Sequence, residues 1–547
     1  MSDTPFEREA MLARLDREEF DLLVVGGGIT GAGVALDAAS RGLSVALVER
    51  DDFASGTSSK SSKLVHGGLR YLQQGDVRLV YQALRERQRL LSNAPHLVSV
   101  LPFLIPILTK DGPVSKKIAK ALRSALWMYD LTGGLRIGKR HQRLDAEHSL
   151  AHCPTMPAEK LSSGFVYYDA SADDARLTLT IVRTAAEHGA VVANRCDVIG
   201  FTHADDGRID GARLDTGDGE VRVRARSTVA ATGVWADAVR ALDGGGDPAT
   251  LRPAKGVHVT VPWDLVRNDI GVIISVPGDK RSLFLVPWVE RPDGGFDHCY
   301  IGTTDTDFVD DLDRPQTNDD DLDYVLRAVN HTLTTTITRD DVTGVWAGLR
   351  PLVTQASSGR TADLSRRHSI TTGDSGLITV TGGKLTTYRE MAEDAVDEVL
   401  VALGRRAPCR TRRLRLLGSG TPPPAVDRHL VGRYGSEAQR LIDLCDADPA
   451  LAEPLVPGLR YRRAEAVFAV RHEMATTLTD VLTRRTRAHL QNRDACLASA
   501  PDVAALLASE LGWDDADVDR QIAAYRTLCD SETEAADRPD PRHAEAS

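Results

Sequence analysis

The sequence lacks the features that mark extracellular and membrane-spanning proteins. Its seven cysteines are scattered along 547 residues without a Cys-x-x-Cys pair, which argues against a disulfide framework and a zinc site. The longest apolar run, Val98 to Leu108, contains two prolines and is too short to cross a bilayer. The N-terminus, MSDTPFEREAMLARLDREEF, has no apolar stretch of the kind that directs secretion. We therefore expect a cytoplasmic protein that crosses no membrane.

An excess of positive charge is also missing. The chain has 67 basic and 78 acidic residues, a formal net charge of −11, which argues against general affinity for nucleic acid. Two segments fall short of metal-binding motifs. The segment HEMAT, which begins at His472, has Thr476 where a zinc protease has its second histidine, and Asp319–Asp321 lacks the spacing of an EF-hand and is typical of a helix start. We expect neither nucleic acid nor metal to bind.

The strongest positive feature is the segment Phe20 to Glu49, FDLLVVGGGITGAGVALDAASRGLSVALVE. An apolar strand runs into Gly26-x-Gly28-x-x-Gly31, then a helix, a second strand and an acid. In this order the glycines allow a tight turn, close approach of a pyrophosphate to the backbone, and close packing of helix on strand. The acid, Glu49, can accept hydrogen bonds from a ribose. The pattern predicts a nucleotide-binding βαβ unit, and the alternative is a glycine-rich turn without a ligand.

Two later strands also end in small residues, which helps to decide between nucleotides. One strand stops at Thr232-Gly233 and another at Gly382-Gly383, where backbone can approach a cofactor. No second Gly-x-Gly-x-x-Gly stands between a strand and a helix, so a separate NADPH domain is not expected. These features favour FAD over NAD and a flavin that is reduced directly by a small substrate. Each strand end taken alone also fits an ordinary buried strand and turn.

Five motifs occur in a fixed order along the chain: GGGITGAGVALDAASRGLSVALVE, SSKSSKLVHGGLRYL, IGTTD, GLRPL and GGKLTTYR. Together they resemble the FAD-dependent glycerol-3-phosphate dehydrogenase family of the respiratory, bacterial aerobic type. The resemblance implies oxidation of sn-glycerol 3-phosphate to dihydroxyacetone phosphate, with hydride transfer to flavin N5 and electrons passed to a membrane quinone. It also implies that six positions line the substrate pocket, namely Arg70, Tyr71, His258, Thr304, Arg350 and Lys384.

The expected fold class is α/β, with a discontinuous Rossmann-like FAD-binding domain, an antiparallel-sheet substrate domain and a C-terminal all-helical domain. Helical periodicity is strongest over 77–91, 174–189 and 388–403. The predicted divisions are 19–97, 166–240 and 346–404 for FAD binding, 98–165 for an excursion facing substrate or membrane, 241–345 for the antiparallel substrate domain, 405–530 for the helical domain and 531–547 for a disordered tail.

A phosphate dianion needs fixed cations, and arginine offers a planar fork that suits phosphate oxygens. Arg70, Arg350, Lys384 and Arg389 each lie beside glycine or a compact turn, so we expect them to bind the substrate. The alternative for each one is a surface ion pair. To cofactor binding we assign Gly26, Gly28, Gly31, Glu49, Thr57, Ser58, Ser62, Lys63, Leu64, Thr232, Gly233, Gly382, Gly383, Lys384, Leu385 and Thr386.

Oxidation of a secondary alcohol requires a group that accepts the hydroxyl proton. His258, in KGVHVTV, is the preferred candidate because imidazole titrates near neutral pH. The alternative is a histidine that only makes a hydrogen bond within its strand. His66, beside Gly67-Gly68, is a competing base and can equally orient the isoalloxazine. Lys384 and Arg350 complete the predicted catalytic set, with Lys384 favouring reduced, anionic flavin electrostatically.

The electron acceptor must come from outside, because the sequence carries no NAD domain, haem motif or iron–sulfur cysteines. Lys116 to Leu131 interleaves basic residues with Ile118, Leu122, Leu126 and Trp127. This segment and the Val98 to Leu108 run can lie on an anionic bilayer surface, although the pattern also fits a helix packed on the core. The resemblance favours a cytoplasmic protein bound peripherally to the inner face of the cell membrane, with a homodimer as one expected assembly.

Three rival functions remain open from the sequence. A glycerol-3-phosphate oxidase would give its electrons to oxygen, and an amine or amino-acid oxidase of related fold would take a different substrate. A non-catalytic nucleotide-binding sensor would hold FAD that no substrate reduces. The cationic set disfavours the second rival, and the HGGLRY and GGKLTTYR segments disfavour the third.

Overall fold

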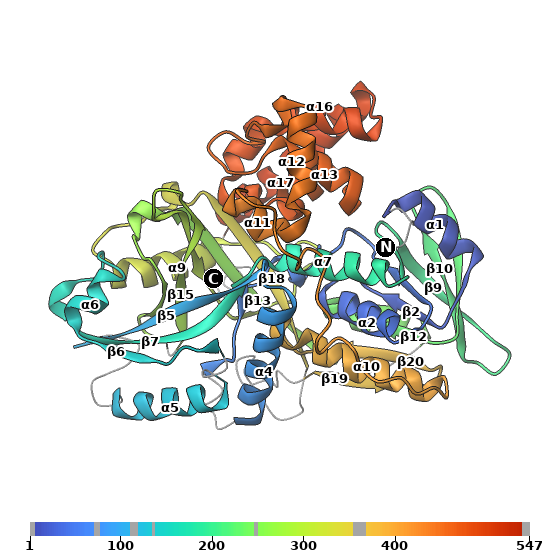
Figure 1. The fold of residues 1–547 in the computed structure, drawn as a ribbon, viewed down its shortest axis with the longest axis horizontal. Coiled ribbons are helices and arrows are strands. Elements are labelled where there is room, and N and C mark those ends of the chain that lie inside the picture. The colour runs from blue at the N-terminus through green and yellow to red at the C-terminus, as the bar shows by residue number, and fades with distance from the viewer. Residues whose placement is uncertain are drawn as a thin grey trace.

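The computed structural model describes residues 6–69, 77–109, 119–133, 137–244, 250–279, 281–353 and 368–538. Two β-sheet bodies lie side by side, and the C-terminal helices pack over the junction between them (Figure 1). Helices α4 (Val77–Asn93) and α5 (Ala119–Thr132) lie on the opposite side of the molecule from those C-terminal helices.

The first body is built on a six-stranded sheet whose strands are parallel except at one edge. Strands buried on both faces need apolar residues throughout, which explains the runs LLVV and VALV. Helices α2 (Ile29–Ser40), α7 (Asp174–Glu187) and α10 (Tyr388–Ala402) pack against this sheet, and α2 contacts both of the others. The strand order is β19 (Ser369–Thr372), β20 (Leu377–Thr381), β12 (Thr228–Ala230), β2 (Leu22–Val25), β3 (Val45–Val48) and β8 (Val191–Ala193).

A smaller four-stranded sheet and helix α1 (Arg8–Arg17) complete this body. The short strand β1 (Glu19–Phe20) pairs with β11 (Glu220–Ala225) in parallel, which ties the start of the described chain to the sheet. Strands β10 (Ile209–Asp215) and β9 (Asp197–His203) extend it as antiparallel partners. Their alternating buried and exposed residues are typical of a sheet with one face in water.

The second body is a ten-stranded sheet, antiparallel except where β14 pairs with β5. Helix α9 (Asp319–Thr332) contacts strands of this sheet, and its start at Asp319 confirms the helix-start interpretation of the acidic run. The main strand order is β17 (Thr306–Asp307), β13 (Leu251–Pro262), β16 (Phe296–Gly302), β15 (Ser282–Glu290), β14 (Gly271–Ser275), β5 (Val98–Leu108), β7 (Leu161–Ala172) and β4 (Leu64–Val65), with β18 (Gly344–Val353) on β13 and β6 (Gln142–Leu144) on β7.

Three expectations about segments change with this sheet. The Val98–Leu108 run is strand β5, between β7 and β14, and its residues 103–108 are buried. Burial therefore argues against a bilayer contact for residues 103–108, whereas Val100 in the first half of the strand is 38% exposed. Strands from 98–165 and from 241–345 form one sheet, so the first is not a separate excursion. Strand β18 also belongs to this sheet and not to the nucleotide-binding body.

The C-terminal part is helical, as expected. Its core is made of buried side chains that include Leu482, Val503 and Tyr525. Helix α17 continues to Ala536, so the predicted disordered tail begins too early; residues 539–547 lie outside the described part. The helices are α11 (Arg428–Tyr434), α12 (Ala438–Ala447), α13 (Arg463–Glu473), α14 (Leu478–Asp480), the π-helix η11 (Val481–Arg485), α15 (Ala488–Gln491), α16 (Arg493–Leu511) and α17 (Asp515–Ala536).

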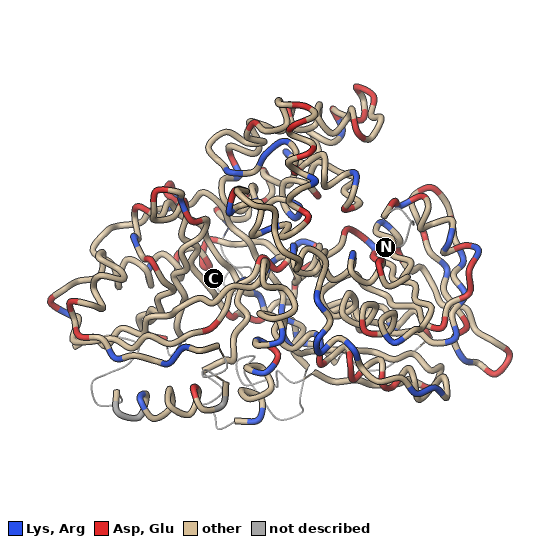
Figure 2. Tube along the Cα trace, in the orientation of Figure 1, with Lys and Arg blue, Asp and Glu red and all other residues tan. Residues whose placement is uncertain are grey.

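Basic and acidic residues are interspersed along the chain trace in both sheet bodies and in the C-terminal helices (Figure 2). The seven cysteines are free thiols. Within the described ranges, none of the helices combines the length and apolar character needed to cross a bilayer.

Candidate active site

A cavity of about 590 Å³ lies between the two sheet bodies. Its wall contains Gly26, Thr232 and Gly382, which follow the carboxyl ends of the neighbouring parallel strands β2, β12 and β20. Strand β13 and strand β18 of the ten-stranded sheet supply the wall at the other end, with His258 and Arg350. In open α/β sheets, ligands bind outside the carboxyl ends of the strands, and the cavity is at this place.

The glycines after β2 stand where a side chain would collide with neighbouring backbone. A Cβ on Gly31 would lie 1.9 Å from the carbonyl oxygen of Gly26, and one on Gly26 would lie 2.8 Å from the carbonyl oxygen of Ala231. Gly26 also has a φ of +105°, which side chains disfavour. Gly31 does not line the cavity, so its role is to let α2 pack closely on the β2 turn. Gly28 is the N-cap of α2 and does line the cavity, which therefore faces the positive end of that helix.

Glu49 stands directly after β3, where the sequence predicts a ribose contact. Its two carboxylate oxygens accept hydrogen bonds from the amides of Gly27 (2.6 Å) and Asp51 (2.9 Å). Burial raises the pKa of this carboxyl to about 7, and nearby Asp51 and Asp52 add repulsion. Glu49 thus lines the cavity, and its two hydrogen bonds hold it against the backbone of Gly27 and Asp51.

Two further strand ends present backbone to the cavity, as the sequence predicts. Thr232 and Gly233 follow β12, and Gly382 and Gly383 follow β20, and all four line the cavity. Gly233, Gly382 and Gly383 have positive φ angles. Three neighbouring strands therefore end in turns that leave room for a ligand along the sheet edge. This shape and the helix terminus fit a dinucleotide that carries a diphosphate.

The segment from Thr57 to Leu64 crosses the middle of the cavity wall. Ser58 Oγ accepts a hydrogen bond of 2.8 Å from the amide of Ile29, in the first turn of α2. Thr57 donates to the carbonyl of Leu349 (2.6 Å), which ties this segment to β18. Thr57, Ser58, Ser62 and Leu64 line the cavity, whereas Lys63 does not. The expected cofactor contact of Lys63 is not supported, because its ammonium group is instead paired with Asp174 at 3.2 Å.

His258 lies in the middle of β13, opposite Gly302 of β16 and Trp346 of β18. Its ring stacks on the Trp346 indole with centroids 4.8 Å apart and planes 7° from parallel. A Cβ on Gly302 would lie 2.2 Å from the imidazole ring, so glycine is required for this placement. Nε2 is 2.9 Å from Ser62 Oγ. Burial, and then the charges of Lys63 and Arg350, hold the His258 pKa well below its usual value.

Arg350 reaches the cavity from β18. It donates to Asp305 Oδ1 (2.9 Å) and to Thr303 Oγ1 (3.1 Å), which fixes the plane of the guanidinium. A Cβ on Gly256 would lie 2.6 Å from Nη2 of this arginine. Glycine in the KGVHV segment therefore makes room for Arg350, as the glycine of IGTTD does for His258.

Lys384, His66 and Thr304 line the same cavity. Lys384 is the N-cap of the short helix η8 (Leu385–Thr387), directly after the Gly382–Gly383 turn. The amide of His66 donates to Thr386 Oγ1 at 3.1 Å, so the two segments meet. Thr304 Oγ1 accepts a hydrogen bond from the amide of Val257 (3.0 Å). Four segments distant in sequence thus converge on one end of the cavity.

Arg389 is placed elsewhere. It is buried in α10, where it donates to both carboxylate oxygens of Glu86 (2.6 and 3.0 Å) and to Glu393 (2.6 Å), and it does not line the cavity. We therefore no longer expect Arg389 to bind substrate, because two carboxylates already hold its guanidinium. Arg70 and Tyr71 lie outside the described residues.

Arg281 and Asp305 also line the cavity, and the sequence patterns predicted neither of them. Arg281 Nη1 donates to the carbonyl of Asp305 (2.6 Å), and Nε donates to Asp279 Oδ2 (2.6 Å). Asp305 is the last residue of the IGTTD motif, and an acid at this place in a motif is a signal for an arginine partner. Arg281 precedes an ordinary strand, and no local pattern marks it. Arg281, Arg350 and Lys384 make this end of the cavity suitable for a small anionic substrate.

Two family models match the chain. That of FAD dependent oxidoreductases covers residues 21–389, and that of the C-terminal domain of alpha-glycerophosphate oxidase covers residues 403–518. Glycerol-3-phosphate dehydrogenase 2 of Mycobacterium bovis is 40% identical over 98% of this chain and 92% of its own length. The mitochondrial glycerol-3-phosphate dehydrogenase of Homo sapiens is 36% identical over 95% of this chain and 75% of its own length.

The fold is similar to solved structures as well. A glycerol-3-phosphate dehydrogenase from Bacillus halodurans complexed with FAD is 30% identical, with a TM-score of 0.77 over 97% of this chain and 99% of its own. An L-alpha-glycerophosphate oxidase from Mycoplasma pneumoniae shares the fold over 72% of this chain and 97% of its own at 17% identity, with a TM-score of 0.55. The predicted fold class and the predicted FAD cofactor are confirmed by these matches.

Proposed function

The chain belongs to the FAD-dependent glycerol-3-phosphate dehydrogenase family, and on this basis we propose that it oxidises sn-glycerol 3-phosphate to dihydroxyacetone phosphate. The observation that carries the proposal is the convergence of His258, Arg350 and Lys384 on the cavity that also contains the glycine turns. A base and two cations then lie beside the site of a redox cofactor, as oxidation of a phosphorylated alcohol requires.

Arg350 and Lys384 are proposed to bind the phosphate of the substrate. Arg350 is oriented by Asp305 and Thr303, so its fork is fixed before the substrate arrives. A guanidinium held in this way loses little conformational freedom when it binds an anion. Arg281 lies beside Asp305 and adds positive charge to the same wall. Arg70 and Tyr71 stay in the proposed substrate-binding set by family resemblance alone.

His258 is proposed as the base that accepts the hydroxyl proton, while His66 stays the competing candidate. FAD, when bound, supplies the hydride acceptor at N5. The low pKa of His258 leaves the imidazole in its neutral, proton-accepting form at pH 7, and it also makes the imidazole a weaker base than a histidine in water. Nε2 is the proposed acceptor of the substrate's hydroxyl proton, because it lies 2.9 Å from Oγ of Ser62, a residue of the cavity wall. Within the described residues, Nδ1 is buried and has no hydrogen-bond partner.

The test is an anaerobic absorbance titration of the FAD-loaded protein with sn-glycerol 3-phosphate. Glycerol, lactate and an amino acid serve as controls, because each lacks the phosphate. Bleaching of the flavin band by the phosphate ester alone is expected. Bleaching by an amino acid would favour an amine or amino-acid oxidase instead. A flavin that none of these compounds reduces would favour a non-catalytic sensor.

A membrane quinone is the proposed electron acceptor, reached at the inner face of the cell membrane. Helices α4 and α5 expose apolar side chains on neighbouring surfaces, with Trp127 and Met128 each 42% exposed and Leu131 70% exposed. Basic residues lie along the same helices (Figure 2). Leu122 and Leu126, which the sequence suggested as membrane contacts, are buried. The proposed contact is therefore the opposite face of α5, while Ile118 lies outside the described residues.

Binding to vesicles tests this surface. The variant with both Trp127→Ser and Leu131→Ser is expected to sediment less with anionic phospholipid vesicles than the unaltered protein. The control variant carries Val309→Ser and Val401→Ser, which remove apolar side chains that are 82% and 77% exposed elsewhere. Equal sedimentation of all three proteins would contradict a membrane contact at α5.

Oxygen is the second candidate acceptor, since the C-terminal family model takes its name from an alpha-glycerophosphate oxidase. The two reactions differ in a measurable product. With glycerol 3-phosphate present, a dehydrogenase reduces a soluble quinone analogue and forms little hydrogen peroxide in air. Stoichiometric peroxide would favour the oxidase.

Light scattering of the purified protein would test the expected homodimer.

A further inference from the structure

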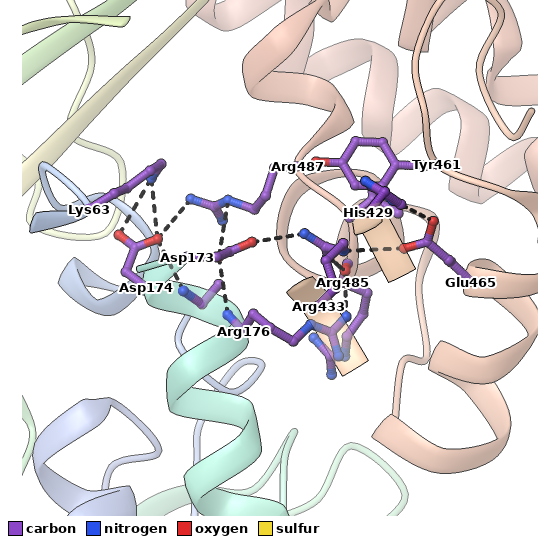
Figure 3. A network of polar contacts seen from close by, with 12 residues as sticks. Lys63, Asp173, Asp174, Arg176, His429, Arg433, Tyr461, Glu465, Arg485 and Arg487 are labelled. Atoms are coloured by element: carbon purple, nitrogen blue, oxygen red, sulfur yellow. Dashed lines mark hydrogen bonds and ion pairs between the residues drawn. The ribbon is translucent and has the colours of Figure 1, made fainter. Parts of the chain in front are cut away.

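The loop Ser59–Lys63 holds the proposed base, and the C-terminal helical domain holds this loop. Arg487, between η11 and α15, is 1% exposed and donates to the carbonyl oxygen of Ser59. The same Nη2 atom lies 3.2 Å from Asp174 Oδ1 at the start of α7. Figure 3 shows Arg487 reaching from the C-terminal domain to Asp174, with Lys63 on the other side of that carboxylate. A C-terminal arginine thus contacts the loop directly and through Asp174.

Asp174 is fully buried and carries most of this connection. Its Oδ2 accepts hydrogen bonds from the amide (2.9 Å) and the hydroxyl (2.7 Å) of Ser61. Its Oδ1 lies 3.2 Å from Lys63 Nζ. A buried carboxylate needs such partners, because charge without them is costly away from water. Asp174 therefore fixes two residues of the loop while Arg487 fixes a third.

The loop conformation itself needs support. Lys63 has a φ of +56°, in the left-handed region that residues with a side chain rarely adopt. Its amide donates to Ser61 Oγ at 3.0 Å. A residue persists in such a conformation when surrounding contacts over-determine it, and the Asp174 and Arg487 contacts supply this constraint.

The same loop acts on the proposed base in two ways, directly through Ser62 and indirectly through Trp346. Ser62 Oγ is 2.9 Å from His258 Nε2. The carbonyl of Ser61 accepts from Trp346 Nε1 (3.1 Å), and Trp346 stacks on the imidazole. The ammonium group of Lys63 lies 4.6 Å from the Trp346 ring centroid, in the range of a cation–π contact. A shift of the loop would therefore move both the hydrogen bond and the stacking partner of His258.

We propose that Arg487 and Asp174 are positioning residues for the oxidation site, through which the C-terminal domain fixes the Ser59–Lys63 loop and thereby His258. This inference rests on the proposed function, because it takes His258 to be the base. Neither residue lines the cavity. In this arrangement the C-terminal domain contributes to the chemistry through the loop.

The experiment compares Arg487→Met and Arg487→Lys with Glu437→Gln in the full-length, FAD-loaded protein. Glu437 makes a two-pronged ion pair with Arg183 of α7 (2.7 and 2.8 Å), so the control also removes the charge from a contact between α7 and the C-terminal domain. It does not touch the Ser59–Lys63 loop. The first readout is the limiting rate of flavin reduction by glycerol 3-phosphate, measured with the substrate dissociation constant by anaerobic stopped flow.

Loss of a buried hydrogen bond to a charged group is expected to slow this limiting rate by about 10- to 100-fold in Arg487→Met. The substrate dissociation constant should change by less than about threefold, because no phosphate contact is removed. Arg487→Lys keeps the charge but loses the planar fork, so its limiting rate should lie between those of Arg487→Met and the unaltered protein. A limiting rate in both Arg487 variants equal to that of Glu437→Gln would overturn the proposal. If Arg487→Met does not fold, the Arg487→Lys comparison decides.

The second readout is hydrogen exchange of peptides covering residues 57–66, which needs no substrate. Faster exchange there in the Arg487 variants, with Glu437→Gln unchanged, is the expected result. Unchanged exchange in the Arg487 variants would overturn the proposal. If glycerol 3-phosphate fails to reduce the unaltered protein, the proposed function falls, and the exchange data still decide whether Arg487 fixes the loop.

Discussion

The two ends of the cavity are built in different ways. The nucleotide end is made mainly of backbone, since Gly26, Gly28 and the glycines of the two later strand-end turns line it without side chains. The substrate end is made of side chains, with His258 and Arg350 held by stacking, ion pairing and hydrogen bonds. The first end offers shape and the N-terminus of a helix, whereas the second offers charges that are placed by distant partners.

Burial acts on both ends and shifts their titrating groups in opposite directions. It raises the pKa of Glu49 to about 7 and lowers the pKa of His258 well below its usual value. The cause is the same, since removal from water disfavours whichever form is charged. At the nucleotide end the affected group is Glu49, which accepts hydrogen bonds from two backbone amides. At the substrate end it keeps the proposed base neutral.

The largest effect is expected from His258→Asn, which removes the proposed base and leaves the nucleotide end intact. Loss of a general base typically slows proton transfer by about 10²- to 10⁴-fold. The limiting rate of flavin reduction should fall in this range while FAD affinity stays unchanged. His298→Gln, at a buried histidine of β16 that does not line the cavity, is the control. A parallel loss of FAD would mean that the two ends are not independent.

Gly31→Ala is expected to act on the nucleotide end instead and to weaken FAD binding. Its Cβ would meet the backbone oxygen of Gly26 at 1.9 Å, so the β2 turn must move. Overpacking of this kind costs about 1–3 kcal/mol, which corresponds to up to about a 100-fold weaker affinity for FAD. Isothermal titration of the apoprotein with FAD measures it. Gly432→Ala, a helical glycine with open space around it, should bind FAD normally. Normal affinity of Gly31→Ala would contradict the packing role.

A change confined to substrate binding is expected from Arg350→Met. Loss of a charge-assisted contact to phosphate should raise KM for glycerol 3-phosphate by about 10- to 100-fold. Arg252→Met removes an arginine that pairs with Asp307 on the same sheet but does not line the cavity, and its KM should stay close to that of the unaltered enzyme. Steady-state kinetics distinguishes the two. An unchanged KM in Arg350→Met would remove Arg350 from the substrate site.

The smallest effect concerns Glu49 and pH. Because its pKa rises from about 4.5 to about 7 on folding, the folded apoprotein holds a proton that the unfolded chain releases between these values. The contribution of Glu49 to stability is present below pH 4.5 and lost as pH rises through 7. Urea unfolding at pH 5 and pH 8 should therefore show a steeper loss in the unaltered apoprotein than in Glu49→Gln. Parallel losses would place the Glu49 pKa near its ordinary value.

The sequence was most informative where contacts are local. The βαβ unit, the helices at 77–91, 174–189 and 388–403, and the two later glycine turns lie where the patterns predict them. It was least informative where a residue's partner is distant. The KLTTYR motif gives no sign that Arg389 pairs with Glu86, 303 positions away, and the SSK motif gives none that Lys63 pairs with Asp174.

By itself, then, the sequence determined the nucleotide end and the family, because glycine spacing and strand–helix periodicity act over a few residues and need no knowledge of the rest of the chain. Tertiary structure decided which of the candidate cations face the cavity, how His258 is stacked on Trp346, and that Arg487 of the last domain reaches the loop beside it. Those outcomes depend on sheet register and on the pairing of buried charges, which arise only when distant segments pack together.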